Sequence, residues 1–253
     1  APIESGYEAN GIEEKIGEAT IQDNKLCFDM ASYQPRTFAI RLKKGKVKAD
    51  PIKNIPLQLP FNSKAFTPEN FGYTVSFDKK GNSFAAELIG DKVTCDDITF
   101  SIANYENKNV IKCKGDTIQL PKEAAGKKLY ILATSTDKDR KAKFIVNSKS
   151  HEFEIPYYSG FYGQWGHKGV SDGYIRNASL AYIGSHRHTK KGNDTYIYTY
   201  MYKFGIELPK EAHTLVLPKD ENIAVFAITL SDNYIDNISA ANEMRTLPLE
   251  VSK

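Results

Sequence analysis

Apolar and polar residues alternate with a period of two along most of this chain, a pattern typical of half-buried β-strands. In the segment 36–42, for example, Phe38, Ile40 and Leu42 alternate with Thr37 and other small or polar residues. Turns rich in Gly, Pro, Asn and Asp separate such runs. The runs cover residues 19–29, 36–42, 74–77, 98–102, 110–113, 128–135, 142–146, 152–155, 180–189, 195–208, 213–217 and 222–231. This spacing predicts an all-β protein, namely a large jelly-roll-like antiparallel β-sandwich.

Helical periodicity is confined to two short segments, Glu13–Glu18 and Asp236–Arg245. Gly11 and Gly17 interrupt the first, and glycine weakens a helix. We therefore expect at most short helices.

A join between two parts of the chain is indicated by the segment 43–70. It opens on a basic run and then contains four prolines, which remove hydrogen-bond donors and disfavour the centre of a sheet. These are Pro51, Pro56, Pro60 and Pro68. We expect residues 43–70 to be a linker or sheet edge and residues 71–253 to be the sandwich domain. Residues 1–42 hold too few strands to close a core and are interpreted as the terminal strands of an incomplete β domain.

One sequence repeat supports a single large sandwich. Ile118–Ala124 (IQLPKEA) recurs as Ile206–Ala212 (IELPKEA), and each copy ends a strand with proline before another apolar strand. Two copies do not make a solenoid. They predict two equivalent strand–turn–strand edges in one sandwich.

Composition and charge exclude several classes of protein. Hydrophobic residues make up 41% and charged residues 26% of the 253, which excludes bulk disorder. The net charge of +3 is too weak to indicate nucleic acid as a partner. No apolar run approaches the roughly 20 residues of a membrane helix, so we expect no membrane partner.

The strand 195–208 is the most informative segment, because every second residue from Tyr196 to Phe204 is aromatic. It follows the strand 180–189 and a loop, Lys190–Asp194, that is typical of a hairpin. In a symmetric hairpin His188 faces Tyr196, and His186 faces Tyr198 in the same way. One sheet face is then expected to carry two histidines and a ladder of aromatic rings.

Three interpretations of this face remain open. The first is a structural core face, which we favour. The second is a carbohydrate platform, on which Tyr196 and Tyr198 stack against sugars while polar neighbours bind hydroxyls; these neighbours are His186, Arg187, His188 and Asp194. The third is a metal site at the two histidines, but no cysteine or third histidine nearby completes a ligand set. The sequence therefore predicts no metal site and no cofactor in this segment.

A second candidate is the segment 156–167, which combines aromatic rings with glycines that let the backbone approach a ligand. Its candidate carbohydrate-binding residues are Tyr158, Phe161, Tyr162 and Trp165. A loop that plugs the end of the sandwich and a glycan-binding loop are both compatible with this composition; we favour the plug.

No catalytic constellation is evident: the nucleophile-elbow, P-loop, H-E-x-x-H and dinucleotide-binding motifs are all missing. Cys27 and Cys113 lie in apolar contexts and are expected to be small buried residues. A disulfide between Cys95 and Cys113 is the alternative. No catalytic residue is predicted.

Two stretches nevertheless resemble a known family. Residues 23–30 (DNKLCFDM) and 32–40 (SYQPRTFAI) resemble the closing strands of the β domain of glycoside hydrolase family 38 α-mannosidases. Residues 184–188 (GSHRH), 200–204 (YMYKF) and 215–218 (LVLP) resemble the distal β-sandwich of the large bacterial members.

This resemblance implies the non-catalytic C-terminal portion of a retaining, zinc-dependent α-mannosidase. In the family, the zinc ion and the aspartate nucleophile lie in an upstream barrel that this sequence does not match. The implied partners are that catalytic domain and a mannose-containing glycan, and the implied compartment is periplasmic or extracellular. The alternative is an independent carbohydrate-binding or adhesion module of a secreted bacterial protein.

Overall fold

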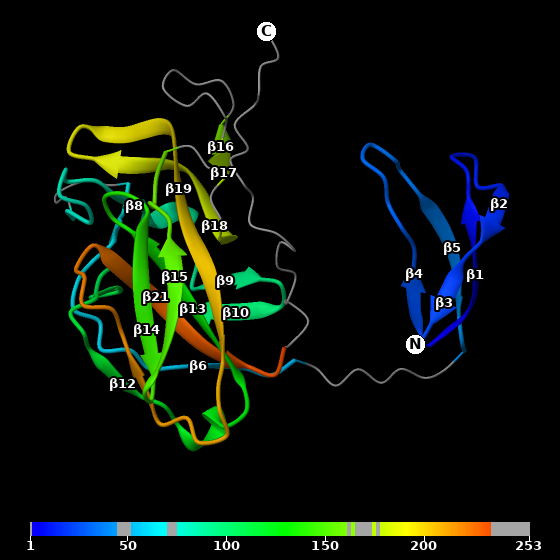
Figure 1. Ribbon diagram of the computed structural model, residues 1–253. Coiled ribbons are helices and arrows are strands. Elements are labelled where there is room, and N and C mark those ends of the chain that lie inside the picture. The colour runs from blue at the N-terminus through cyan, green and yellow to red at the C-terminus, as the bar shows by residue number, and fades with distance from the viewer. Residues whose placement is uncertain are drawn as a thin grey trace, which may run out of the picture. The chain divides into compact units, whose positions relative to one another are not determined.

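The computed structural model describes residues 2–44, 52–69, 75–160, 163–164, 174–175 and 178–233. The chain forms two compact units, Ala1–Pro51 and Ile52–Lys253 (Figure 1). The boundary lies inside the proline-rich segment 43–70, and the second unit begins before residue 71. Pro56 ends a short strand, β6, that pairs with the last strand of the second unit.

The first unit consists of short antiparallel strands. A three-stranded sheet has the order β2-β1-β5, and β3 and β4 form a hairpin. The bounds are β1 Ile3–Ala9, β2 Lys15–Glu18, β3 Thr20–Gln22, β4 Lys25–Cys27 and β5 Thr37–Leu42. The two-residue turn of the hairpin, Asp23-Asn24, has positive φ at both residues, as a type I′ turn requires.

The helix expected at Glu13–Glu18 is wrong, because these residues form a turn and strand β2. The Asn10 side-chain oxygen accepts hydrogen bonds from the backbone N–H groups of Ile12 and Glu14, at 3.1 and 2.9 Å. This closes a tight turn and sends the chain back along β1, where Tyr7 pairs with Glu18. The other expected helix, Asp236–Arg245, lies outside the described residues.

The second unit is a β-sandwich. Its main sheet has the order β11-β21-β13-β19-β18-β8-β7, with β6 also on β21, and its second sheet has the order β12-β20-β14-β15. The strands of the main sheet are β6 Asn54–Pro56, β7 Phe66–Thr67, β8 Ser83–Ala85, β11 Ile111–Lys112, β13 Lys128–Ser135, β18 Ser179–Thr189, β19 Gly192–Glu207 and β21 Ile223–Ser231. Those of the second sheet are β12 Thr117–Gln119, β14 Arg140–Val146, β15 Lys149–Ile155 and β20 Thr214–Val216.

Smaller elements complete the second unit. They are the pairs β9 Lys92–Cys95 with β10 Ile98–Ser101 and β16 Gly163–Gln164 with β17 Tyr174–Ile175, and the 3₁₀ turns η1 Ala86–Leu88 and η2 Lys122–Ala124. No helix in the described part of the chain is long and apolar enough to cross a membrane. The expectation of an all-β sandwich is confirmed.

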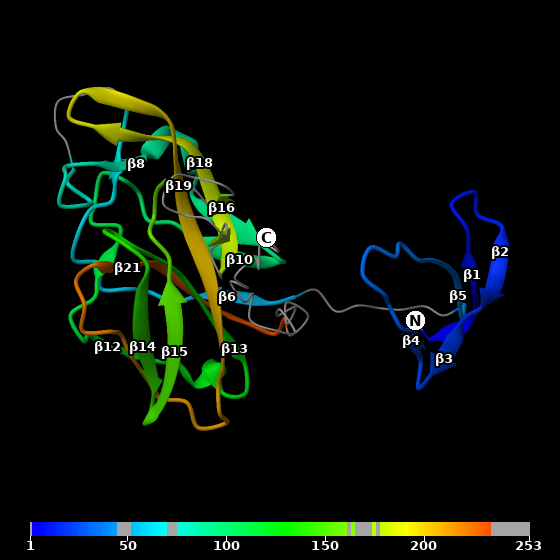
Figure 2. The same cartoon turned by 45° about the horizontal axis from the view of Figure 1, so that its top comes forward.

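Two apolar clusters lie on opposite faces of the main sheet. Residues Leu129 and Ile131 of β13 belong to the first, which also contains Phe144 of β14. Tyr130 and Leu132 of the same strand belong to the second, which we call the aromatic core. Figures 1 and 2 show β14 and β15 lying over the main sheet. Successive side chains of β13 therefore pack into the two clusters in turn, as the period of two of a β-strand requires.

The repeated segments lie together at one end of the sandwich. Leu208 donates its backbone N–H to the carbonyl of Lys127, at 2.9 Å, and Leu120 donates to His213, at 2.8 Å. Ala124 and Ala212, the last residues of the two copies, are both buried in the first cluster. The two copies thus lie in one sandwich, but they are not the two equivalent edges that the repeat predicts. The strand of the first copy, β12, is an edge of the second sheet, whereas β19 lies between β13 and β18 in the main sheet.

One predicted strand is not a strand. Residues 75–77, the described part of the run 74–77, lead into a turn in which Asp78 accepts hydrogen bonds from the backbone N–H groups of Lys80 and Asn82, both at 2.9 Å. Gly81 lies in this turn with φ +82°. The turn places Phe77 in the aromatic core without any strand pairing.

The cysteines form no disulfide within the described residues. Cys113 is buried, as expected, and its burial raises the pKa of the thiol. Cys27, by contrast, is exposed. It is the last residue of β4 in the β3–β4 hairpin of the first unit.

The aromatic core generates a stability prediction. Phe84 of β8 is fully buried, and its ring lies 5.3 Å from that of Phe77 and 5.4 Å from that of Phe226. We expect Phe84→Ala to lower the free energy of unfolding by about 3–5 kcal/mol, because it removes these contacts and leaves a cavity. Tyr105→Ala, at a side chain that is 37% exposed, should change it by less than about 1 kcal/mol. Urea unfolding followed by circular dichroism measures both, and equal effects would contradict this description of the core.

Candidate functional site

The β18–β19 hairpin carries the candidate residues, and its register differs from the symmetric hairpin expected. The loop has only two residues, because Thr189 pairs with Gly192. The Thr189 hydroxyl accepts from the N–H of Lys191, at 3.1 Å, and donates to the Gly192 carbonyl, at 3.0 Å. This tight turn shifts the partners: His188 faces Asn193, and His186 faces Thr195. The predicted pairing of the histidines with tyrosines is therefore wrong.

A bulge in β19 divides the run of aromatic residues. Between the pairs His186–Thr195 and Gly184–Thr199, three residues of β19 lie opposite a single residue of β18. The first of the three, Tyr196, has φ +64°, which is unusual for tyrosine. Its side chain is 82% exposed and that of Tyr198 is 41% exposed. Beyond the bulge the rings are buried, so the expected single aromatic ladder is not formed; the buried rings are Tyr200, Tyr202 and Phe204.

The start of the second sequence candidate, residues 158–160, lies along the same strand. The Tyr198 carbonyl accepts hydrogen bonds from the backbone N–H of Gly160, at 3.2 Å, and from the hydroxyl of Ser159, at 3.0 Å. The Tyr200 hydroxyl in turn donates to the Gly160 carbonyl, at 2.8 Å. The fold thus joins the start of the segment 156–167 to the aromatic strand.

Tyr158 is a core residue. It is fully buried, and its hydroxyl donates to the Asp78 carboxylate at 2.8 Å. Burial raises the pKa of Tyr158, and the negative charge of Asp78 raises it further, so the hydroxyl keeps its proton. A ring in this place offers no face to a sugar. The other candidates of this segment, Phe161, Tyr162 and Trp165, lie outside the described residues.

An ion pair crosses the hairpin near its tip. The Arg187 guanidinium donates to the Asp194 carboxylate through Nε, at 2.8 Å, and Nη2 lies 2.7 Å from the same oxygen. Burial alone would lower the pKa of Arg187, but its hydrogen bond to Asp194 and the nearby charges outweigh burial and raise the pKa. The pair fixes the hairpin while leaving part of both side chains accessible, at 20% and 35% exposure.

The histidines meet a residue that the sequence did not single out, Glu87 of η1. The Nε2 atoms of His186 and His188 lie 3.2 and 2.9 Å from the same oxygen of the Glu87 carboxylate. On the far side of its ring, His188 Nδ1 lies 3.0 Å from the hydroxyl of Thr67 in β7. Thr67 is in turn hydrogen-bonded to Ser83 of β8. We call Glu87, His186 and His188 the His₂Glu cluster.

Strand pairing explains how the cluster forms. β8 pairs with β18, so that His188 lies opposite Ser83, and η1 follows β8 directly. The pairing of β8 with β18 therefore places Glu87 beside His186, although the two residues are 99 positions apart in the sequence. No motif spacing could have indicated this contact, because it depends on which strands are neighbours in the sheet.

Two buried hydroxyls beside the cluster lack a hydrogen-bond partner among the described residues. They belong to Tyr182 and Thr199. Gly184 lies between them: a Cβ there would be 2.8 Å from the Tyr182 hydroxyl and 2.5 Å from the Thr199 oxygen, so only glycine fits. Burial raises the pKa of Tyr182, and the charge of Glu87 raises it further.

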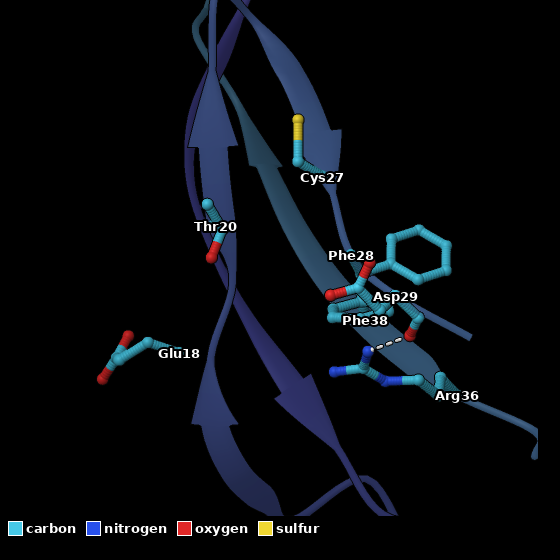
Figure 3. A pocket seen from close by; sticks show the side chains of 7 residues that line it. All are labelled: Glu18, Thr20, Cys27, Phe28, Asp29, Arg36 and Phe38. Atoms are coloured by element: carbon cyan, nitrogen blue, oxygen red, sulfur yellow. Dashed lines mark hydrogen bonds between the residues drawn. The ribbon is translucent and has the colours of Figure 1, made fainter. Parts of the chain in front are cut away.

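A hollow in the first unit has a structural explanation. It measures about 420 Å³ and is lined by Glu18, Thr20, Cys27, Phe28, Asp29, Arg36 and Phe38 (Figure 3). The Arg36 guanidinium donates to both oxygens of Glu8, each at 2.7 Å, and to the Asp29 carbonyl, at 2.6 Å. It also lies over the ring of Phe38, at 5.1 Å, and the pairing lowers the pKa of Glu8. Arg36 is thus held in place by contacts within this unit.

Two carboxylates of the second unit, those of Asp137 and Asp96, are paired with cations. Asp137 accepts two hydrogen bonds from Arg140, at 2.7 and 2.6 Å, and these lower its pKa to about 2. A carboxylate that stays ionised in this way is a poor general acid. Asp96 pairs with Lys203 at 2.5 Å.

The bulge in β19 generates a second stability prediction. Glycine adopts positive φ without steric cost, and the exposed Tyr196 ring has little packing to lose. Tyr196→Gly should therefore raise the free energy of unfolding by up to about 1 kcal/mol. Tyr198→Gly, at a strand position without positive φ, should lower it by about 1 kcal/mol. Thermal unfolding of the two variants distinguishes them, and destabilisation of both would contradict the strained conformation of Tyr196.

Comparison with known protein families gives one match, and it covers most of the chain. The AziU2-like beta-sandwich domain matches residues 53–234, which begin at the start of the second unit and include both of its sheets. The description names a β-sandwich and makes no link to glycoside hydrolase family 38 or to mannosidases. No curated protein matches the chain. The chain belongs to the family of AziU2-like beta-sandwich domains.

Proposed function

We propose that this β-sandwich is a non-catalytic module that binds carbohydrate at the exposed end of its β18–β19 hairpin. The observation that carries the proposal is Tyr196, whose ring is 82% exposed on a backbone with φ +64°. A conformation of this kind costs about 1–3 kcal/mol and is concentrated at sites that bind ligands. A strained residue that directs an aromatic ring into water is a candidate contact.

The surroundings of Tyr196 suit a sugar. Aromatic rings offer an apolar face for the C–H groups of a pyranose, and tyrosine also offers a hydroxyl. Tyr198, 41% exposed, lies two residues along the strand, and the Arg187–Asp194 pair lies two residues in the other direction. The pair presents a donor and an acceptor for hydroxyl groups. Of the candidates named from the sequence, these four support the proposal; Tyr158 does not.

The resemblance to glycoside hydrolase family 38 suggests a more specific form of the proposal. In that form the chain is the C-terminal portion of an α-mannosidase, and it serves as a scaffold or shapes the substrate entrance beside a zinc-bearing barrel. The alternative is an independent carbohydrate-binding or adhesion module. The complete reading frame distinguishes the two: a barrel encoded upstream supports the mannosidase, and a signal peptide just before Ala1 supports the free module.

The binding proposal predicts a loss of affinity in two variants. Each stacked ring is worth about 0.5–1.5 kcal/mol beyond its buried area, so Tyr196→Ala and Tyr198→Ala should each weaken binding of mannose-containing oligosaccharides about three- to tenfold. Tyr33→Ala is a matched control for Tyr196→Ala, because Tyr33 is likewise an exposed tyrosine with positive φ, at +57°, but lies in the first unit. Titration calorimetry measures the affinities. Absence of glycan binding, or binding that neither hairpin variant changes, would refute the proposal.

The non-catalytic part of the proposal has its own test. Glycoside cleavage needs two carboxyl groups, or a metal and a carboxylate, held around the anomeric carbon. We expect no turnover of an aryl α-mannoside by the purified chain, with or without added zinc. Turnover that survives repurification and disappears in Glu87→Gln would place a catalytic site in this sandwich and contradict the assignment.

A further inference from the structure

The His₂Glu cluster has a composition that the sugar-binding proposal does not use. Glu87, His186 and His188 each offer one ligand atom, and these atoms all lie within 4.8 Å of one another. We propose that the cluster is a binding site for a divalent transition-metal ion of the zinc type. This site is independent of the glycan site proposed at Tyr196 and Tyr198.

The spacing of the ligand atoms suits such an ion. Zinc binds histidine nitrogen and carboxylate oxygen at about 2.0–2.2 Å, and in a tetrahedral site two such ligands lie roughly 3.3 Å apart. The two Nε2 atoms lie 3.2 and 2.9 Å from the Glu87 oxygen. Two of the three separations between ligand atoms are therefore close to those of a tetrahedral site, and all three lie within 4.8 Å.

The groups around the histidines resemble the support of a metal ligand. A metal-binding imidazole usually donates its other N–H to a fixed oxygen, which sets its tautomer and the direction of its lone pair. His188 Nδ1 lies 3.0 Å from the Thr67 hydroxyl, which is itself held by Ser83. With Nδ1–H donating to Thr67, the lone pair of Nε2 points toward Glu87. His186 Nδ1 lies 3.3 Å from the Ser185 hydroxyl, a weaker contact of the same type.

The His₂Glu cluster is partly buried and remains accessible to solvent on the side of Glu87. The side chain of His188 is 5% exposed, that of His186 is 15% exposed and that of Glu87 is 30% exposed. Histidine and carboxylate ligands with an open position are typical of zinc and iron sites that keep a bound water, whereas magnesium and calcium prefer oxygen ligands alone. The buried Tyr182 hydroxyl near Glu87, without a partner among the described residues, offers a hydrogen bond to such a water.

The competing interpretation is a hydrogen-bonded triad without metal, in which Glu87 accepts the Nε2 protons of both histidines. The two states differ in the tautomer of the histidines. In the triad each Nε2 carries a proton that Glu87 accepts, whereas a metal-bound histidine carries its proton on Nδ1 and offers the Nε2 lone pair to the ion. Only the second state binds zinc.

The test is zinc binding by the full chain, freed of any purification tag and of metal. Calorimetric titration should show one site. Glu87→Gln and His186→Ala should each weaken it at least about tenfold, because each removes a ligand. Thr67→Val should weaken it about 10- to 100-fold, because it removes only the support of His188.

Matched controls come from elsewhere in the second unit. Glu123 occupies the first turn of the other 3₁₀ segment, η2, and His213 is an exposed histidine. Glu123→Gln and His213→Ala should leave zinc affinity unchanged. Far-UV circular dichroism establishes that each variant is folded, and Glu87→Gln keeps an oxygen that accepts the histidine N–H groups. No zinc binding by the wild-type chain, or binding that Glu87→Gln and His186→Ala leave within twofold, would overturn the proposal.

Discussion

Burial of β13 on both faces holds the second unit together. All eight of its residues are buried, and its alternate side chains enter the two apolar clusters on opposite sides of the main sheet. Its edges are hydrogen-bonded to β19 and β21, with Ile131 opposite both Phe204 and Ile228. Each fully buried side chain of this size contributes about 1.5–3 kcal/mol, so the strand fixes its neighbours firmly. The position of β19 follows from this contact.

The candidate sites lie in or beside the part of β19 that does not pair with β13. Its second half pairs with β13, from Tyr202 to Glu207, while its first half pairs with β18 as a hairpin and, over a short stretch, with residues 158–160. The bulge at Tyr196 lies in this less constrained half, where an irregular backbone disrupts no central strand. On the other edge of β18, β8 brings Glu87 to the two histidines. This strand pair thus carries two exposed tyrosines, Tyr196 and Tyr198, and a partly buried His₂Glu cluster.

The sequence predicted the parts of the fold that depend on local periodicity. Burial on alternating sides made strands such as 128–135 and 222–231 recognisable from their apolar residues. Prediction from periodicity failed at two turns, where the side chains of Asn10 and Asp78 accept hydrogen bonds from the backbone. A single hydrogen-bonding side chain of this kind can end a periodic run. The hairpin register failed for a similar reason: the Thr189 hydroxyl closes a shorter turn than the loop composition suggested. Glu87 could not be predicted at all, since its contact with His186 depends on pairing between distant strands.

The pairing of β8 with β18, which holds Glu87 against both histidines, is the claim on which the proposed metal site depends. Anomalous diffraction at the zinc absorption edge, from crystals of the full chain soaked in zinc, tests it most directly. The account predicts one peak about 2.0–2.2 Å from the Nε2 atoms of His186 and His188 and from a Glu87 carboxylate oxygen. A peak bound elsewhere, for example at the exposed Cys27, or a Glu87 side chain that contacts neither histidine, would contradict it.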